Sequence, residues 1–238
     1  MGLLLLSTAV RAELAVPALT GRVIDQAGIL STSERDALDA RIRALETATT
    51  GQVAVLIIPS LEGDSLEGFS LRVAESWKIG RKGADNGAIL LISQAEHKIR
   101  LEIGYGWEGQ VNDARAGDII RAMGPWFRKG NYAQGIDYAL AELQTLITGK
   151  RPAGAPPHVQ PRRRRYDPGV GGIFLFVFML ILLSSLGGWG RRRFGLGPVI
   201  FLGGGGFGGR GGGGGFSGGG GFSGGGGSFG GGGASGGW

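Results

Sequence analysis

Oxygen-bearing side chains occur in loops of this chain next to predicted strands and helices. The residues are Asp25, Asp85, Asn86, Glu108 and Asp113. In an open α/β sheet, loops at one end of the strands gather the groups that bind ligands. Carboxylate and amide oxygens are the ligands that hard cations such as Ca²⁺ and Mg²⁺ prefer. These residues therefore predict a divalent-cation site.

Ordinary structural roles also explain the same residues. Asp113 suits the cap of a helix. Asp85 and Asn86, followed by Gly87, have the composition of a turn, and Asp25 suits a local acceptor of backbone N–H groups. Both interpretations stay open at this stage.

Further residues near these loops suit the lining of a ligand cleft. Tyr105 lies in a glycine-punctuated loop, Arg81 and Lys82 precede Asp85, and Arg100 lies in a predicted strand. The cationic side chains are candidates for holding an anion such as phosphate. Packing of Tyr105 on the core, and solvation of Arg81 and Lys82, are the alternatives.

The sequence lacks the motif of a well-defined enzyme type. Its histidines are His97, in a predicted turn, and His158, in a proline-rich stretch, so a histidine-based triad or zinc site is not expected. Cysteine is absent, which excludes disulfides and thiolate metal sites. The glycines around Tyr105 lack the spacing of a dinucleotide fingerprint.

The hydrophobic pattern predicts alternating helices and strands. Ser31 and Glu34 have the spacing of a capping box. Helices are expected at about 33–49, 65–80, from 112 or 113 onward, and 131–148, and strands at 52–59, 88–93 and 98–103. This order predicts an α/β fold, a three-layer α/β/α sandwich around a small mixed sheet.

Composition divides the chain into five parts. They are a signal peptide at 1–12, the α/β domain at 13–150, a Pro/Arg linker at 151–168, a transmembrane helix at 169–190 and a disordered glycine-rich tail at 191–238. The stretch 169–190 is uncharged, and about 20 apolar residues cross a bilayer as a helix. The tail has almost no side chains to bury, so it is expected to be a spacer.

The charge distribution argues against nucleic-acid binding. The whole chain has a formal net charge of +6, but residues 13–150 hold 15 Lys and Arg against 18 Asp and Glu. The arginines at 162–165 and 191–193 flank the predicted span, where anionic lipid headgroups attract them. The expected partners are thus the lipid bilayer and an unidentified membrane protein.

Arginines on both sides of the span leave its orientation open by charge alone. A cleaved signal peptide would place the α/β domain outside the cytoplasm and the tail inside it. Without a working signal the arginines before the span favour the reverse. We expect the first arrangement, a single-pass protein of the cell membrane.

Several stretches of the chain form one recognisable series, namely residues 23–31, 50–55, 77–80, 82–87, 99–106 with 108–109, and 128–135. Together, in this order, they resemble the TPM-domain family. The resemblance implies a three-layer α/β/α domain, usually extracytoplasmic. Within the family, acid phosphatases, calcium binders and helpers of membrane protein complexes are known, which favours Ca²⁺ over Mg²⁺ here.

Two functions follow as hypotheses. The first is an accessory protein that binds a divalent cation and assists the maintenance or assembly of a membrane protein complex. The second is a metal-assisted acid phosphatase acting on phosphate monoesters, in which the cation would polarise a phosphoryl oxygen and activate water. The second lacks a positioned general base, so the first is preferred.

Overall fold

The computed structural model describes residues 13–159, 177–179 and 224–238. Residues 13–159 and 224–238 belong to one compact unit. Residues 177–179 are helical and belong to a second unit. The predicted signal peptide at 1–12 lies outside the described residues.

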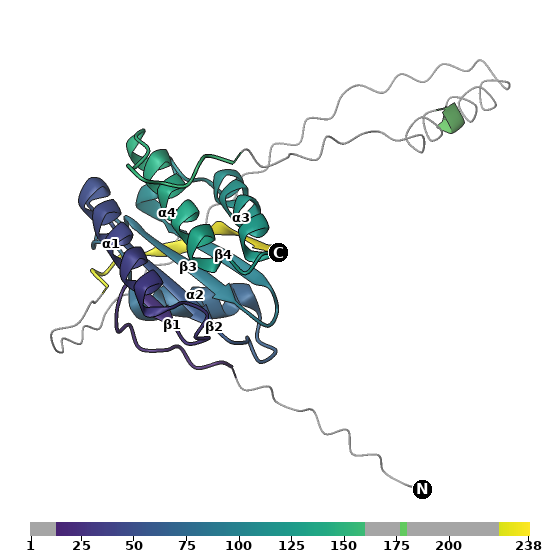
Figure 1. The fold of residues 1–238 in the computed structure, drawn as a ribbon, viewed down its shortest axis with the longest axis horizontal. Coiled ribbons are helices and arrows are strands. Elements are labelled where there is room, and N and C mark those ends of the chain that lie inside the picture. Colours follow the sequence, from purple (N-terminus) through teal and green to yellow (C-terminus); the bar gives the residue numbers. More distant parts are fainter. Residues whose placement is uncertain (1–12, 160–176, 180–223) are drawn as a thin grey trace, which may run out of the picture. The chain divides into compact units, whose positions relative to one another are not determined.

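Five strands and four helices, with one short 3-10 helix, build the main unit (Figure 1). In chain order they are β1 (Val23–Asp25), α1 (Thr32–Thr49), β2 (Gln52–Ile58), α2 (Leu66–Trp77), β3 (Gly87–Ser93), β4 (Lys98–Gly104), η1 (Tyr105–Trp107), α3 (Asp113–Phe127), α4 (Tyr132–Thr148) and β5 (Phe229–Gly237). The sheet order is β1-β2-β3-β4-β5. The first three strands are parallel, and β4 and β5 each run antiparallel to the strand before them. The predicted mixed α/β sheet is confirmed.

Helix α1 begins where the capping box was predicted. The Ser31 hydroxyl accepts the backbone N–H of Glu34, and the Glu34 carboxylate accepts the N–H of Ser31 at 2.9 Å. Two N–H groups at the start of the helix, those of Ser31 and Glu34, which would otherwise be unpaired, are satisfied in this way. Leu38, Ile42 and Leu45 then turn one buried face toward the sheet.

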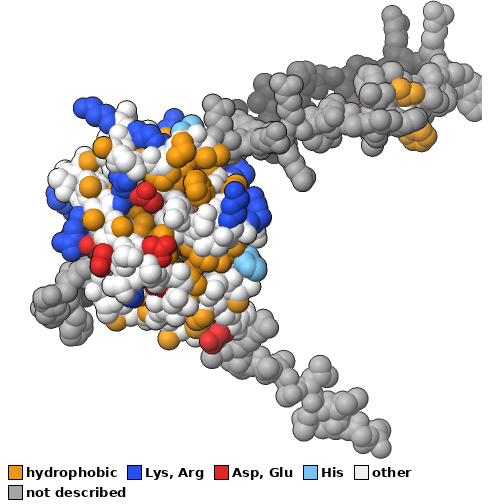
Figure 2. Space-filling view, in the orientation of Figure 1, with side chains coloured by type: hydrophobic (Ala, Val, Ile, Leu, Met, Phe, Trp, Pro, Cys, Tyr) orange, Lys and Arg blue, Asp and Glu red, His pale blue; other side chains and the backbone are white. Residues whose placement is uncertain are grey.

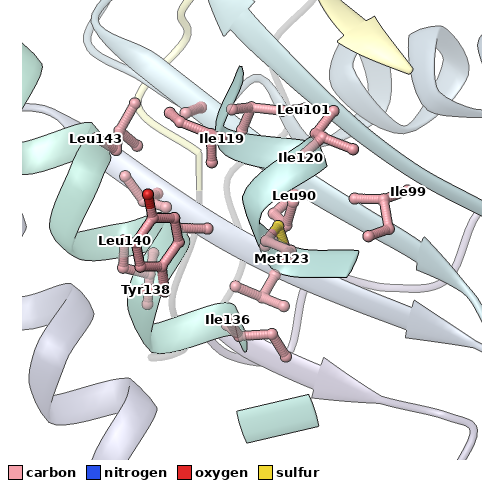
Figure 3. Packing of buried hydrophobic residues seen from close by; sticks show 14 of the residues in the cluster. Leu90, Ile99, Leu101, Ile119, Ile120, Met123, Ile136, Tyr138, Leu140 and Leu143 are labelled. Atoms are coloured by element: carbon pink, nitrogen blue, oxygen red, sulfur yellow. The ribbon is translucent and has the colours of Figure 1, made fainter. Parts of the chain in front are cut away.

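Helices cover both faces of the sheet. One apolar cluster joins the sheet to α1, α3 and α4, and a second joins it to α2. Figure 3 shows Leu90 and Leu101 of the sheet beside Ile120 and Met123 of α3. Because both faces are covered, β2 and β3 are continuous apolar runs rather than alternating ones.

Residues 151–159, predicted as part of a linker, pack on α4. Glu142 of α4 pairs with Arg151, and its Oε1 lies 2.8 Å from Nδ1 of His158. Burial raises the pKa of Glu142, but the hydrogen bonds from these two partners outweigh burial and leave it below the ordinary value. The Tyr138 hydroxyl donates to the carbonyl of Val159 at 3.1 Å. Contacts with α4 thus extend to residue 159.

The end of the glycine-rich tail is a strand. Residues 229–237 form β5 along the outer edge of β4, drawn in yellow beside the sheet in Figure 1. For residues 224–238 the prediction of a disordered tail is therefore wrong. The physical reason is that glycine lets the main chain approach the domain closely, so ordering does not depend on burying side chains.

Most of the predicted transmembrane helix at 169–190 and of the tail lies outside the described residues. The helical residues 177–179 fall inside the predicted span and expose their apolar side chains. None of the helices in the described part of the chain has the length and apolar character to cross a membrane.

Candidate functional site

Asp85 lies in the loop before β3, pressed against the loop after β4. Its carbonyl oxygen accepts the N–H of Gly106 at 3.0 Å. A Cβ at Gly104 or Gly106 would overlap the carbonyl oxygen of Asp85 or Ala84, so this close approach requires glycine. The carboxylate of Asp85 points outward and accepts the backbone N–H of Ser228 at 2.8 Å.

Glu108 and Asp113 follow η1 in the chain and lie on the same side of the domain as Asp85. Asn112 caps α3 by accepting the N–H of Arg115 at 3.1 Å, so the cap expected of Asp113 is made by its neighbour. The Asp113 carboxylate instead accepts the N–H of Gly233 at 2.9 Å. Glu108, Asn112 and Asp113 line, with Tyr105, a hollow of about 640 Å³.

We call Asp85, Tyr105, Glu108 and Asp113 the rim. Each of its members meets the segment that contains β5. Asp85 bonds to Ser228 and Asp113 to Gly233, while a Cβ at Gly230 or Gly232 would overlap Tyr105 or Glu108. The carboxylates are therefore spaced along an extended strand rather than gathered around one point.

Asp25 lies at the opposite end of the sheet. It pairs in register with Ile57 near the end of β2, whereas Asp85 precedes Gly87, which pairs with Gln52 at the start of β2. At about 3.3 Å per residue, roughly 16 Å of strand separates the two rows. The Asp25 carboxylate accepts the N–H groups of Gly28 and Leu30, both at 2.8 Å. The prediction that Asp25 belongs to one five-residue cation site is wrong, because its carboxylate hydrogen-bonds to backbone N–H groups of its own loop.

Asn86, next to Asp85 in the chain, links two other backbone segments by hydrogen bonds. It is buried, its Oδ1 accepts the N–H of Arg81 at 3.0 Å, and its amide donates to the carbonyl of Thr50 at 3.0 Å. The turn interpretation of Asp85 and Asn86 therefore describes Asn86 better than the ligand interpretation does.

Arg100 is paired with a buried acid and does not stand free in the cleft. Its Nε lies 2.5 Å from Oε1 of Glu102, which is 1% exposed, and the Ser70 hydroxyl also donates to this carboxylate. A second guanidinium nitrogen donates to the Ser235 hydroxyl at 3.0 Å. Burying a carboxylate requires such a partner, and this is the role of Arg100.

Arg81 and Lys82 meet the same segment through their main chain. The N–H of Lys82 donates to the carbonyl of Gly225 at 3.0 Å, and Arg81 forms a β-bridge with Gly226. Both side chains are exposed. Figure 2 shows that basic and acidic side chains both occur on the face formed by α1, α3 and α4.

Sequence reasoning missed two residues that hold the segment. The Oε1 of Gln52 accepts the N–H groups of Gly80 and Gly225, at 2.9 and 2.7 Å. The Glu67 carboxylate accepts the Ser235 hydroxyl at 2.7 Å, and this hydrogen bond is the main reason that the pKa of Glu67 lies below its ordinary value. Neither residue carries a local signal for this role, because its partner in residues 224–238 lies more than 160 positions away.

Within residues 13–159, 177–179 and 224–238, no three acidic or histidine side chains come together as a metal-binding group. Glu108 and Asp113 are the two predicted ligands that share one hollow. A cation bound there would draw its remaining ligands from Asn112 and water.

A family model described as the TPM domain matches residues 23–146. The chain belongs to the TPM domain family. The resemblance seen in the sequence is thereby confirmed. The strand β5 and the rest of the 224–238 segment lie outside the stretch that matches the TPM domain.

Solved structures similar to this TPM domain protein include the N-terminal domain of a protein from P. gingivalis. It is 32% identical, with a TM-score of 0.50, and the match covers 59% of this chain and 89% of that one. The N-terminal domain of protein cg2496 from Corynebacterium glutamicum is 16% identical, covering 62% and 95% with a TM-score of 0.46. The search of curated proteins gave no match.

Proposed function

We propose that this TPM domain protein is a membrane-tethered accessory protein that acts by binding, with the rim as its binding site. The observation that supports this is the pair of hydrogen bonds from Ser228 and Gly233 N–H groups to Asp85 and Asp113. Carboxylates that accept main-chain N–H groups in this way hold an extended polypeptide by hydrogen bonds. Binding of this kind breaks no covalent bond and needs no catalytic group. Such a site suits a protein that assists the assembly or maintenance of a membrane protein complex.

The tether in this proposal is the uncharged stretch 169–190. Its length matches a bilayer core. The signal-like stretch 1–12 supports an extracytoplasmic domain. A single span at 169–190 would place residues 224–238 across the membrane from the domain, whereas the pairing of β5 with β4 requires both in one compartment. A single-span tether and docking of residues 224–238 within one chain are therefore alternatives, and a measurement of membrane topology distinguishes them.

A divalent cation is the second ligand that we propose, because Glu108 and Asp113 line one hollow with Asn112. Ca²⁺ fits this pair better than Mg²⁺, since it accepts irregular geometry and several waters. The N–H of Gly233 bonds to Asp113 and cannot coordinate a cation. Cation binding through that oxygen and strand docking would therefore compete.

The cation proposal is tested on the full chain in detergent micelles by thermal unfolding with and without CaCl₂. A ligand that binds the native state raises the midpoint temperature of unfolding. At a concentration of 100 times its Kd, it adds about 2.7 kcal/mol to the free energy of unfolding. Asp113→Asn should remove the rise. Asp36→Asn, at an exposed site in α1, is the matched control and should keep it. If Ca²⁺ moves no midpoint, the cation part of the proposal fails while strand recognition stands.

Of the three cationic side chains expected to clamp phosphate, Arg81 and Lys82 are exposed, and Arg100 gives the phosphatase hypothesis no support. Arg100 is committed to Glu102 and Ser235. The rim itself is acidic, and its carboxylates would repel a phosphate monoester in the absence of a metal. We therefore propose no catalytic function.

A further inference from the structure

The segment 224–238 occupies a groove that is shaped for main chain without side chains. A Cβ at Gly224 or Gly227 would overlap carbonyl oxygens of Trp77 or Ile79, and one at Gly233 would overlap that of Leu101. Gly233 also has φ of +141°, which side chains disfavour. A carbonyl oxygen cannot swing aside as a side chain does. Glycine at these positions is therefore a condition of docking.

Aromatic and polar anchors fix the register of this segment. The Trp238 ring meets Phe127 edge-on, with centroids 4.9 Å apart, and meets His97 in the same way at 5.1 Å. Phe229 packs against the α2 side of the sheet and Ala234 against the α3 side. Asp85 binds the main chain at Ser228, just before Phe229, and Asp113 binds it at Gly233, just before Ala234. Side chains that alternate between faces, with main-chain pairing between them, define recognition by strand addition.

The segment adds little to the core of the domain. Phe229, Ala234 and Trp238 are only partly buried, and the fully buried members of both apolar clusters come from residues 24–143. The TPM domain match also ends at residue 146, far before the segment. A strand held by hydrogen bonds and a few partly buried side chains can leave while the hydrophobic core stays intact.

We propose that the outer edge of β4 and the rim form a peptide-binding groove whose ligand class is an extended, glycine-rich segment with an aromatic anchor. The occupant is the chain's own segment 224–238, a built-in ligand that docks and undocks. This inference rests on the proposed function and names the ligand of the same site. While docked, the segment closes the edge of β4 and occupies the carboxylates of Asp85 and Asp113, so that another extended peptide reaches this edge only after it leaves.

The test uses the full chain in detergent micelles and a fluorescein-labelled peptide of residues 224–238, with binding followed by anisotropy. Gly233→Ala in the chain should undock the built-in segment without touching the groove. This variant should bind the peptide saturably. Wild type should bind it at least about tenfold more weakly, because a tethered competitor acts at a high effective concentration. Gly109→Ala is the matched control, since a Cβ there meets nothing within 4 Å, and should behave as wild type.

Two further measurements keep the outcome decisive. A peptide that itself carries Gly233→Ala should not bind, and hydrogen exchange of the β4 amides should quicken in the Gly233→Ala chain. Absence of saturable peptide binding to this chain, or equal binding of both peptides, would overturn the proposal. If wild type is a dimer and Gly233→Ala makes it a monomer, the segment in the groove comes from a second copy of the chain. That result would overturn docking within one chain. A Ca²⁺-induced rise of the unfolding midpoint that Asp113→Asn removes would support the cation part of the proposed function even if the peptide fails to bind.

Discussion

The carboxylate of Asp113, in the first turn of α3, accepts a 2.9 Å hydrogen bond from the backbone N–H of Gly233 in β5. These residues are 120 positions apart. The start of a helix carries a partial positive charge, which attracts an acidic side chain at this position. One side chain thus serves both its own helix and a distant strand.

Replacing Asp113 with Ala should weaken docking of the segment by about 1 kcal/mol, the usual net value of one hydrogen bond. The readout is hydrogen exchange of the β4 amides that pair with β5, which should quicken roughly fivefold. Asp36→Ala, in an exposed turn of α1, should change nothing. Unchanged exchange in Asp113→Ala would show that this bond does not hold the strand.

Docking should also depend on pH through Glu67. The hydrogen bond from Ser235 lowers the pKa of Glu67 from an ordinary value of 4.5, so the docked state favours the ionised carboxylate. The contribution of this pair is therefore complete above about pH 4.5 and is lost as pH falls through the lowered pKa. Peptide binding to the Gly233→Ala chain should weaken over that range. With a peptide carrying Ser235→Ala, the part of the pH dependence that comes from Glu67 should disappear, and an identical profile for both peptides would argue against the linkage.

Arg100→Met should destabilise the domain strongly. It leaves the carboxylate of Glu102, 1% exposed, without its guanidinium. Loss of one partner of a buried pair costs about 3–5 kcal/mol. Chemical denaturation gives the free energy of unfolding. The double variant Arg100→Met with Glu102→Met should recover much of the loss, because no buried charge remains.

The matched control for this prediction is Arg121→Met. Arg121 pairs with Asp118 on the surface of α3, with 58% of its side chain exposed. Exposed pairs contribute about 0–1 kcal/mol, so this variant should stay close to wild type. Equal losses for Arg100→Met and Arg121→Met would contradict the assignment of Arg100 to a buried pair.

The pairing of β5 with β4 makes a prediction about membrane topology. Docking within one chain requires the domain and residues 224–238 on the same side of the membrane, whereas a single span at 169–190 would place them on opposite sides. The chain has no cysteine, so Ala37→Cys and Ser228→Cys each create a single exposed thiol, one in the domain and one in the segment. A membrane-impermeant maleimide should label both from the same side of intact cells. Labelling from opposite sides would rule out docking within the chain.

Local patterns in the sequence predicted most of the domain. Ser31 and Glu34 specify the start of α1 because a capping box involves only neighbouring residues. The apolar runs that became β2 and β3 needed only their own composition to be identified as buried strands. The TPM family was evident from short motifs in a fixed order.

The candidate site was predicted in part. Asp85, Tyr105, Glu108 and Asp113 do lie along one side of the domain, next to one strand. Asp25 does not, because it is the last residue of a parallel strand whereas Asp85 precedes one, and the two ends of parallel strands are opposite edges of the sheet. The sequence contains this information only once strand directions are known.

What the sequence by itself determined is the set of helices and inner strands, because their hydrophobic periodicity is a local property. The tertiary structure alone decided the role of the glycine-rich end. Glycine has no side chain with which to form a periodic pattern, so residues 224–238 resemble a spacer when considered alone. Their role depends on the carbonyl oxygens of Trp77, Ile79 and Leu101, which are distant in sequence. These oxygens lie so close to the main chain of the segment that they leave no room for a Cβ at the glycines beside them.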